Sequence, residues 1–231
     1  MNRETAQSLN LTSATDTTAT LRVDASTSNP SGGRNSVRVE SKNTYNSGLF
    51  IFDIIHTPYG CGTWSALWLT DGPNWPNNGE IDILESHNHG SHGNEMSLHT
   101  TGGCSMDGGE RRQSGTSLEG NCDVGGDGNA GCGVTGDPGT YGVGFNGGGG
   151  GVSLYHLLYR VWLFCSSAYS YLMYRFMRWN FATRESGSGI SLVPRYQPIS
   201  TMDQLPILRP GEYRWLISPV QTVILGLISG I

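Results

Sequence analysis

Short apolar runs separated by turn residues constrain this chain most strongly. The run TWSALWLT at 63–70 places Trp64 and Trp68 on one face of a strand, because strand side chains alternate with a period of two. The run GLFIFDIIH at 48–56 is apolar at successive positions, which predicts a central strand covered on both faces. Turn residues are dense in DGPNWPNNG at 71–79. This pattern shows no helical period and predicts an antiparallel β-sandwich or jelly roll.

Other segments repeat the strand pattern. Strand-like runs are ATLRVD at 19–24, SVRVES at 36–41, EIDILE at 80–85 and NEMSLHT at 94–100. In SVRVES, Val37 and Val39 share one predicted face. Residues 101–151 are rich in glycine and are predicted to form a long surface loop.

Composition agrees with many turns and few helices. Gly accounts for 34 of 231 residues, about twice its usual share, and charged residues are only 14%. The formal net charge is −5, so the chain lacks the basic character of a nucleic-acid-binding protein, and we expect no nucleic-acid partner.

Charge is distributed unevenly along the chain. Residues 1–151 contain seven Lys and Arg against sixteen Asp and Glu, a net of −9. Residues 152–231 contain seven Arg, no Lys and three acids, a net of +4. Arg160, Arg175 and Arg178 interrupt the apolar windows of this second part, so we expect no membrane span.

Cysteine usage points to an oxidising compartment. The five cysteines are Cys61, Cys104, Cys122, Cys132 and Cys165. Their spacing matches no zinc pattern, which favours disulfides and an extracellular protein. The sequon at Asn10 agrees with secretion. The start MNRETAQSLN has no apolar signal segment, so we expect either a mature chain or a missing N-terminus.

Three carboxylates stand within six residues of the run EIDILE: Glu80, Asp82 and Glu85. On a strand, Glu80 and Asp82 share a face, and a β-bulge around residues 83–84 would return Glu85 to it. The two glutamate carboxyls would then lie about 5–6 Å apart, which is the separation that retaining glycosidases use. Asp82 between them can hydrogen-bond a glutamate and keep the two pKa values apart.

Three other interpretations of this acidic run stay open. Carboxylates bind calcium, but Ile and Leu occupy positions at which an EF-hand loop needs oxygen ligands or glycine. The run could also be a solvated strand face without a chemical role. A helix N-capped at Asn78 is the third interpretation, which the β-rich surroundings disfavour.

Aromatic residues flank the acids. Trp64, Trp68 and Trp75 precede them, and His99 follows on the next predicted strand. Aromatic faces stack on the apolar C–H faces of sugar rings, so tryptophan beside paired acids suits a glycan cleft. One of Trp64 and Trp68 could instead belong to the core. His99 could orient a carboxylate, contact a sugar hydroxyl or be a buried histidine with satisfied hydrogen bonds.

The runs GCGTWSALWLTDGPNWPNNGEIDILE and NEMSLHTTGGC closely resemble glycoside hydrolase family 16, specifically the fungal laminarinase-like endo-1,3(4)-β-glucanases. EIDILE is similar to the E-x-D-x-x-E active-site signature of that family, and GRNSVRVESKNTYNSGLFIFDI is similar to the strands before it. The resemblance covers about residues 19–151. It implies an all-β, concanavalin A-like jelly-roll sandwich with a glycan cleft across its concave face.

The resemblance also implies a reaction. Family members hydrolyse internal β-glucan linkages with net retention, which makes Glu80 the nucleophile, Asp82 the assisting acid and Glu85 the general acid/base. We therefore predict a secreted endo-β-glucanase that acts as a monomer on β-1,3 or mixed β-1,3/1,4 glucans. We expect no dissociable cofactor, and we assign no metal ligand.

The resemblance assigns substrate-binding candidates as well. Trp68 and Trp75 match positions that line the sugar subsites, and His99 matches the histidine of the family's L-H-T run beside the catalytic strand. Trp64 is a further substrate-binding candidate. Ser65 replaces the proline that is usual in W-P-A-x-W, and we expect this change to matter little to the chemistry.

The resemblance ends near Val152. The tail that follows does not resemble the second half of the family, which contributes more sheet. We therefore divide the chain into a partial sandwich at 1–151 and a divergent Arg- and aromatic-rich tail at 152–231, and we hypothesise a frameshift or retained intron just after GGGGG. Without the strands of the second half, Phe50 and Phe52 would be partly exposed.

Two alternatives to hydrolysis stay open. The chain could be a non-catalytic glycan-binding sandwich or an inactive truncated fragment, in which case it would bind laminarin without releasing reducing sugar. It could also be a cell-wall transglycosylase that uses the same carboxylates, which product lengths at high acceptor concentration would reveal.

Overall fold

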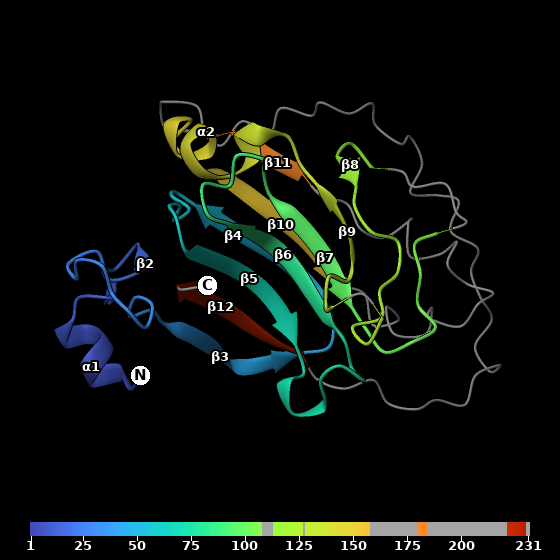
Figure 1. The fold of residues 1–231 in the computed structure, drawn as a ribbon, viewed down its shortest axis with the longest axis horizontal. Helices are drawn as coiled ribbons and strands as arrows, with labels where there is room; N and C mark the ends of the chain where they lie inside the picture. Colours follow the sequence, from blue (N-terminus) through green and yellow to red (C-terminus); the bar gives the residue numbers. More distant parts are fainter. Residues whose placement is uncertain (108–112, 127, 158–179, 184–220, 230–231) are drawn as a thin grey trace.

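The computed structural model describes residues 1–107, 113–126, 128–157, 180–183 and 221–229. Their main body is two antiparallel sheets packed face to face, and a third sheet has only two short strands (Figure 1). In spatial order, the large sheet contains β3 (Arg38–Tyr45), β12 (Gln221–Ser229), β5 (Thr63–Thr70), β6 (Glu80–His87), β7 (Glu95–His99), β9 (Cys132–Thr135) and β8 (Thr116–Ser117). The small sheet contains β11 (Asn180–Thr183), β10 (Gly151–Leu157) and β4 (Gly48–Ile54). The prediction of an all-β sandwich is confirmed.

The core lies between the two sheets and is built by strand alternation. Its buried residues include Leu67, Leu69, Ile81, Ile83, Leu84 and Leu98 from the large sheet and Tyr155 from the small sheet, with Phe50, Phe52 and Ile54 packed against them. Burying one such large side chain contributes about 1.5–3 kcal/mol. The core therefore fixes which face of β5, β6 and β7 points outward, and that outward face carries the polar residues.

Strand β4 departs from the sequence-based expectation. It was predicted to be covered on both faces, but its residues alternate between partly buried and exposed. Leu49 is 60% exposed and Ile51 is 61% exposed, whereas Phe50 and Phe52, which alternate with them along the strand, face the core. The apolar run thus forms a strand with a single covered face.

Segments after residue 150 supply strands to both sheets, although no strand alternation was recognised there. β10 pairs along its whole length with β4, and β11 pairs with the other edge of β10. β12 lies between β3 and β5 and pairs with both. Its pairing with β5 runs from Thr222 opposite Thr70 to Ser229 opposite Thr63. The division of the chain at residues 151 and 152 stays a prediction.

The N-terminal segment forms a small unit beside the large sheet (Figure 1). It contains α1 (Arg3–Ser8), β1 (Thr12–Ala14) and β2 (Ala19–Leu21), and the last two pair with each other. Oδ1 of Asn2 caps α1 by accepting a hydrogen bond from the Thr5 backbone N–H at 2.9 Å. Val37 packs into the small core of this unit, whereas Val39, predicted to share its face, is 42% exposed.

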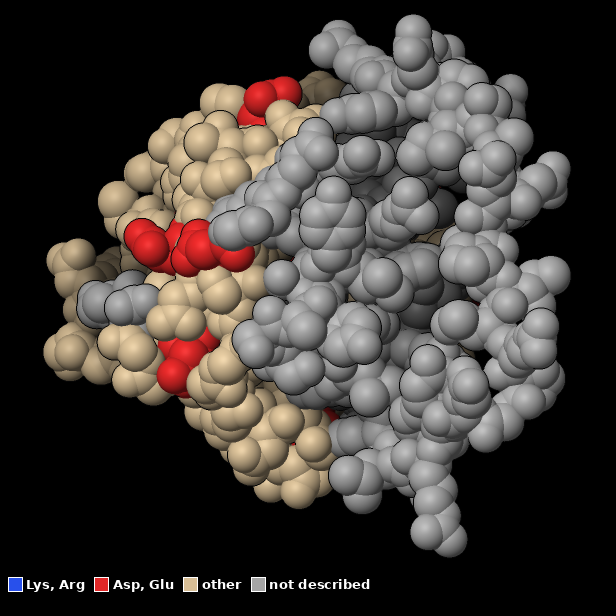
Figure 2. Space-filling view, turned by 90° about the vertical axis from the view of Figure 1, so that its right-hand side faces the viewer, with Lys and Arg blue, Asp and Glu red and all other residues tan. Residues whose placement is uncertain are grey.

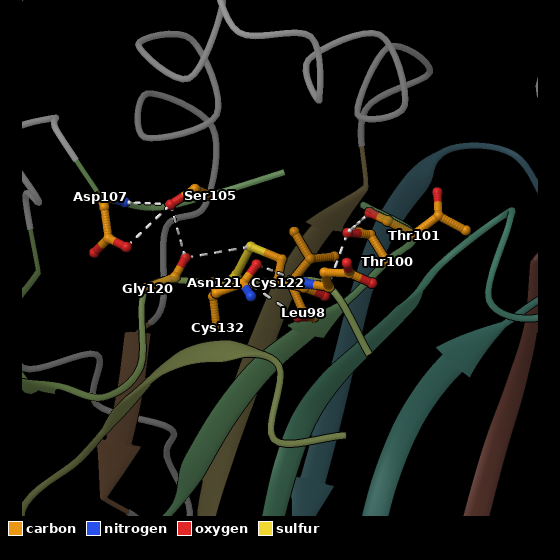
Figure 3. The surroundings of a disulfide bond; sticks show 10 residues. Leu98, Thr100, Thr101, Ser105, Asp107, Gly120, Asn121, Cys122 and Cys132 are labelled. Atoms are coloured by element: carbon orange, nitrogen blue, oxygen red, sulfur yellow. Dashed lines mark hydrogen bonds between the residues drawn. A yellow bond between two sulfur atoms is a disulfide. The ribbon is translucent and has the colours of Figure 1, made fainter. Parts of the chain in front are cut away.

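The glycine-rich region contains more regular structure than a surface loop. It includes β8, β9, a short helix α2 (Gly142–Gly147) and the 3₁₀ turn Pro138–Thr140, and the turn-rich segment before β6 contains a second 3₁₀ turn, Gly72–Asn74. A disulfide joins Cys122 to Cys132, the first residue of β9. The cysteine pattern predicted disulfides but did not identify the pairs. Figure 3 shows this disulfide beside Leu98 and Thr100, at the end of β7.

The membrane prediction concerns residues that are only partly described. Among the described residues, no helix combines the length and the apolarity needed to cross a membrane. Arg160, Arg175, Arg178 and Cys165 lie outside the described residues.

Candidate active site

Strand β6 contains the bulge that the sequence predicted. In its pairing with β5, Leu67 lies opposite Leu84 and Trp68 lies opposite Asp82, so Ile83 is an extra residue without a partner of its own. One extra residue shifts the alternation of a strand by one position. The third acid of EIDILE therefore returns to the face of the first two, and the helical interpretation of this run is wrong.

Burial separates the two faces of β6. Ile81, Ile83 and Leu84 belong to the core, whereas Glu80 and Glu85 are half-buried on the opposite face. The apolar residues between the acids are thus structural, and they hold the acids in place.

Asn94 satisfies the backbone groups that the bulge leaves unpaired. Its Oδ1 accepts a hydrogen bond from the backbone N–H of Glu85 at 2.8 Å, and its Nδ2 donates one to the carbonyl of Ile83 at 3.1 Å. Asn94 is fully buried, and buried backbone groups need such partners. Sequence reasoning missed Asn94; the predicted bulge, which implies unpaired backbone groups nearby, was the available signal.

Glu80 is held from two sides. Nε1 of Trp75 donates a hydrogen bond to Oε2 of Glu80 at 2.5 Å, and the Glu80 and Asp82 carboxyls hydrogen-bond each other. Burial and the charge of Asp82 raise the pKa of Glu80 from 4.5 to about 7, while the charge of His99 and the Trp75 hydrogen bond lower it. Glu80 therefore keeps its proton up to near-neutral pH.

Asp82 is the buried centre of the site, with only 1% of its surface exposed. Its Oδ2 accepts a hydrogen bond from Oγ of Ser97 at 2.7 Å and lies 3.0 Å from Nε2 of His99. Burial lowers the pKa of His99, but the hydrogen bond to Asp82 and the surrounding acidic charges outweigh burial and raise the pKa. Of the three interpretations of His99, orientation of a carboxylate matches this geometry; Ser97 was not predicted.

Glu85 has its own tryptophan partner. Nε1 of Trp64 donates a hydrogen bond to Oε1 of Glu85 at 2.6 Å. Burial and the charge of Asp82 raise the pKa of Glu85 to about 8, against the Trp64 hydrogen bond. The pKa values of both glutamates are thus raised toward and above neutrality by burial beside Asp82.

Trp64 and Trp75 contact the acids, and none of Trp64, Trp68 and Trp75 belongs to the buried core. Trp64 and Trp75 are each 39% exposed, and the alternative that Trp64 or Trp68 is a core residue is wrong for the described structure. The guanidinium of Arg38 lies 4.7 Å from the centre of the Trp68 ring, a cation–π contact. Sugar binding by these residues and by His99 stays a prediction.

Acidic side chains lie on one side of the described structure. Figure 2 shows the side of the molecule that lies to the right in Figure 1, and the described residues visible there include acidic side chains but no Lys or Arg. The expectation of no nucleic-acid partner stays a prediction.

Together, the fold and the site define a class of protein: an antiparallel β-sandwich with two glutamates around an aspartate on one sheet face has the carboxylate pair of a glycoside hydrolase. The family model of the XgeA-like, catalytic GH16 domain matches residues 1–168. The chain therefore belongs to glycoside hydrolase family 16, and this match extends beyond residues 19–151 at both ends.

Curated relatives are similar over part of their length. A probable glycosidase of Schizosaccharomyces pombe is 46% identical over 155 residues, which cover 66% of this chain and 36% of the relative. The endo-1,3(4)-beta-glucanase xgeA of Emericella nidulans is 45% identical over 121 residues, which cover 52% of this chain and 19% of the relative. The matched region thus spans between about a fifth and about a third of these proteins.

Solved structures of the same family superpose on nearly the whole chain. Laminarinase 16A of Phanerochaete chrysosporium, with β-glucans in its donor and acceptor sites, gives a TM-score of 0.72 at 32% identity and covers 99% of this chain and 74% of that one. An elongating family 16 β-1,3-glucosyltransferase gives a TM-score of 0.67 at 29% identity and covers 99% and 72%.

Proposed function

We infer that this chain is an endo-β-glucanase that hydrolyses internal β-1,3 or mixed β-1,3/1,4 linkages with retention of configuration. The observation that carries this proposal is the placement of Glu80, Asp82 and Glu85 on one sheet face by the bulge at Ile83. The names of the relatives, endo-1,3(4)-beta-glucanase and laminarinase, support the substrate class.

The proposed reaction gives the two glutamates different roles, as the E-x-D-x-x-E signature of the family implies. Ionised Glu80 attacks the anomeric carbon while Glu85 gives its proton to the departing glycosidic oxygen, which breaks the linkage and leaves a glycosyl ester on Glu80. Glu85, now ionised, then takes a proton from water as the water oxygen attacks the same carbon and releases Glu80. Asp82 hydrogen-bonds Glu80 and is itself held by His99 and Ser97.

Hydrolysis of laminarin and lichenan tests this assignment. We expect Glu80→Gln to abolish release of reducing sugar from both polymers, because an amide cannot form the glycosyl ester. Glu119→Gln is the matched control, since Glu119 is exposed and lies outside the site. Proton NMR of the first products should show the β anomer; turnover by Glu80→Gln, or an initial α anomer, would contradict the proposal.

Transglycosylation is a second candidate function, favoured by the similarity to the glucosyltransferase. The same glycosyl ester would then be released by a sugar hydroxyl in place of water. Product lengths at rising concentrations of a laminari-oligosaccharide acceptor distinguish the two reactions: elongated products indicate transfer, and their absence indicates hydrolysis. Laminarin binding without either product would leave the chain a glycan-binding module.

We further propose that the chain acts outside the cell as a monomer. The disulfide between Cys122 and Cys132 supports the location, because such bonds persist in oxidising compartments. Size-exclusion chromatography coupled to light scattering, and detection of the protein in the medium or cell wall of its source, test the two parts of this proposal.

A further inference from the structure

A second group of polar side chains lies on the same face of the large sheet, beyond Glu85. His87 ends β6, His92 lies in the loop that follows, and Glu95 begins β7. One donor atom from each, an imidazole nitrogen or a carboxylate oxygen, lies within 4.8 Å of the other two. These three residues are termed the histidine cluster.

The contacts within the histidine cluster are close. Nε2 of His92 lies 3.0 Å from Oε1 of Glu95, and the side chains of these two residues are 34% and 29% exposed. The rings of His87 and His92 lie 5.0 Å apart between centroids. The cluster is thus half-buried, with its donor atoms gathered at one point that solvent can reach.

The backbone holds these donors in place. Glu95 lies directly opposite Glu85 in the pairing of β6 with β7, so two of the three donors stand on hydrogen-bonded strands. The loop between them is pinned, because the carbonyl of His92 accepts a hydrogen bond from Oγ1 of Thr135 at 3.2 Å, and the Gly93 N–H bonds the Gly90 carbonyl at 3.0 Å. Donors placed by a sheet need little reorganisation to meet a ligand.

We propose that the histidine cluster binds a divalent transition-metal ion of the Zn²⁺ class. Two imidazoles and one carboxylate form a known donor set for zinc sites that have three protein ligands and an open fourth position. Tetrahedral bonds of about 2.0–2.2 Å place donor atoms about 3.4 Å apart, so small side-chain rotations complete the geometry. Ca²⁺ and Mg²⁺ prefer all-oxygen ligands, whereas imidazole suits Zn²⁺, Cu²⁺ and Ni²⁺.

A simpler role for two of these residues is an ion pair in which one proton lies between His92 and Glu95. A metal ion must displace that proton, because a ligating imidazole nitrogen is unprotonated. His87 is the residue that separates the two interpretations. An ion pair of His92 with Glu95 does not use His87, whereas a metal site does.

A nearby pair of donors determines the design of the experiment. Sγ of Cys61 lies 3.4 Å from Nε2 of His89, and this exposed pair offers zinc two further ligands. Zinc binding is therefore measured on the full 231-residue chain carrying Cys61→Ser. His89→Gln is the matched control, because it removes a histidine of the same HNHGSH run that does not belong to the cluster.

Calorimetric titration with Zn²⁺ after EDTA treatment and dialysis tests the proposal. We expect one equivalent to bind, unaffected by excess Ca²⁺, and we expect His92→Gln and Glu95→Gln each to weaken binding at least about tenfold, the loss that removal of even a supporting contact causes. His87→Gln should weaken zinc binding to a similar extent. If circular dichroism shows that the His92→Gln variant is unfolded, His87→Gln takes its place in the test. No zinc binding by the Cys61→Ser chain, or equal weakening by His89→Gln, overturns the proposal.

A second measurement places the ion. The rings of Trp64 and His87 lie 6.1 Å apart between centroids, so a paramagnetic ion on His87 sits beside Trp64. Cu²⁺ should quench part of the tryptophan fluorescence, and Trp64→Phe should reduce the quenched part. Quenching that is unchanged in both Trp64→Phe and His87→Gln would place the ion elsewhere. These readouts do not depend on whether the chain hydrolyses glucan.

Discussion

Asn94 and Glu85 are joined by a hydrogen bond from the Glu85 backbone N–H to the Asn94 side-chain oxygen, 2.8 Å long, inside the sheet. Nδ2 of Asn94 donates a hydrogen bond to the Ile83 carbonyl, so a single side chain completes the hydrogen bonding of the bulge. The orientation of Glu85 therefore depends on a residue nine positions later in the chain.

Replacing Asn94 should destabilise the fold. Asn94→Leu leaves one buried N–H and one buried carbonyl without partners, and each such group costs about 1–3 kcal/mol. We expect a loss of about 2–4 kcal/mol in the free energy of unfolding, measured in urea. Asn74→Ala, which removes an exposed amide bound to Asp71, should cost less than about 1 kcal/mol. Equal losses in the two variants would contradict the role of Asn94.

The two tryptophan hydrogen bonds should control opposite limbs of the pH–rate profile. The Trp75 hydrogen bond lowers the pKa of Glu80, so Trp75→Phe raises that pKa and moves the acid limb of kcat/KM to higher pH. The Trp64 hydrogen bond lowers the pKa of Glu85, so Trp64→Phe moves the alkaline limb to higher pH. Profiles measured on a soluble β-glucan check this, and a shift of the same limb in both variants would reverse or remove the assigned roles.

Stability should fall as the pH rises through the range in which the buried acids lose their protons. The pKa of Glu80 is raised from 4.5 to about 7 on folding, and that of Glu85 to about 8, so the folded state holds more protons than the unfolded state between these values. The raised pKa of His99 acts in the same direction. Glu80→Gln should therefore have a higher Tm than the wild type at pH 8 and a similar Tm at pH 5. A difference independent of pH would show that burial of charge is not its cause.

Gly90 should tolerate no side chain. Its φ of +59° lies in the left-handed region, and an added Cβ would lie 2.3 Å from Cδ1 of the buried Tyr141 ring. We expect Gly90→Ala to cost about 2–4 kcal/mol, because steric overlap adds to a backbone cost of about 1–2 kcal/mol. Gly62→Ala isolates the backbone cost, since Gly62 has a φ of +73° and nothing within 4 Å of an added Cβ. Thermal unfolding of both variants measures the difference.

Removing the disulfide should destabilise the large sheet where β9 pairs with β7, the strand that ends at His99. Cys122 and Cys132 are 10 positions apart, and a closed loop of this size stabilises the fold by about 2.5–3 kcal/mol. The double variant Cys122→Ala/Cys132→Ala should lose about that amount in urea unfolding. Hydrogen exchange should show the loss first at Leu98, whose carbonyl oxygen lies 3.6 Å from Sγ of Cys132. Loss of protection that begins far from β7 would place the effect elsewhere.

Local pattern was sufficient to predict the strands of the candidate site. The period of two in TWSALWLT predicted β5 to the residue, and the spacing of Glu80, Asp82 and Glu85 predicted the bulge, because only an extra residue puts three such acids on one face. These inferences depend on neighbours within a few positions, and strand alternation is a property of that range.

Features that depend on distant pairing were not predictable in the same way. An apolar run such as that of β4 is compatible with one covered face or two, because only the second layer decides, and Leu49 and Ile51 are exposed. Asn94 and the histidine cluster come together only when β7 folds back along β6. The HNHGSH run signalled unusual chemistry, but its donor partner Glu95 lies on another strand.

The bulge in β6 also makes the site depend on how the strand pairs. If the same sequence paired with β5 as a uniform pleat, with a partner opposite Ile83, every side chain after Ile83 would exchange faces. Leu84 and Ser86 would then replace Glu85 and His87 on the outer surface. A one-residue slip in the pairing, with the sequence unchanged, would therefore remove the proposed proton donor and a proposed metal ligand together.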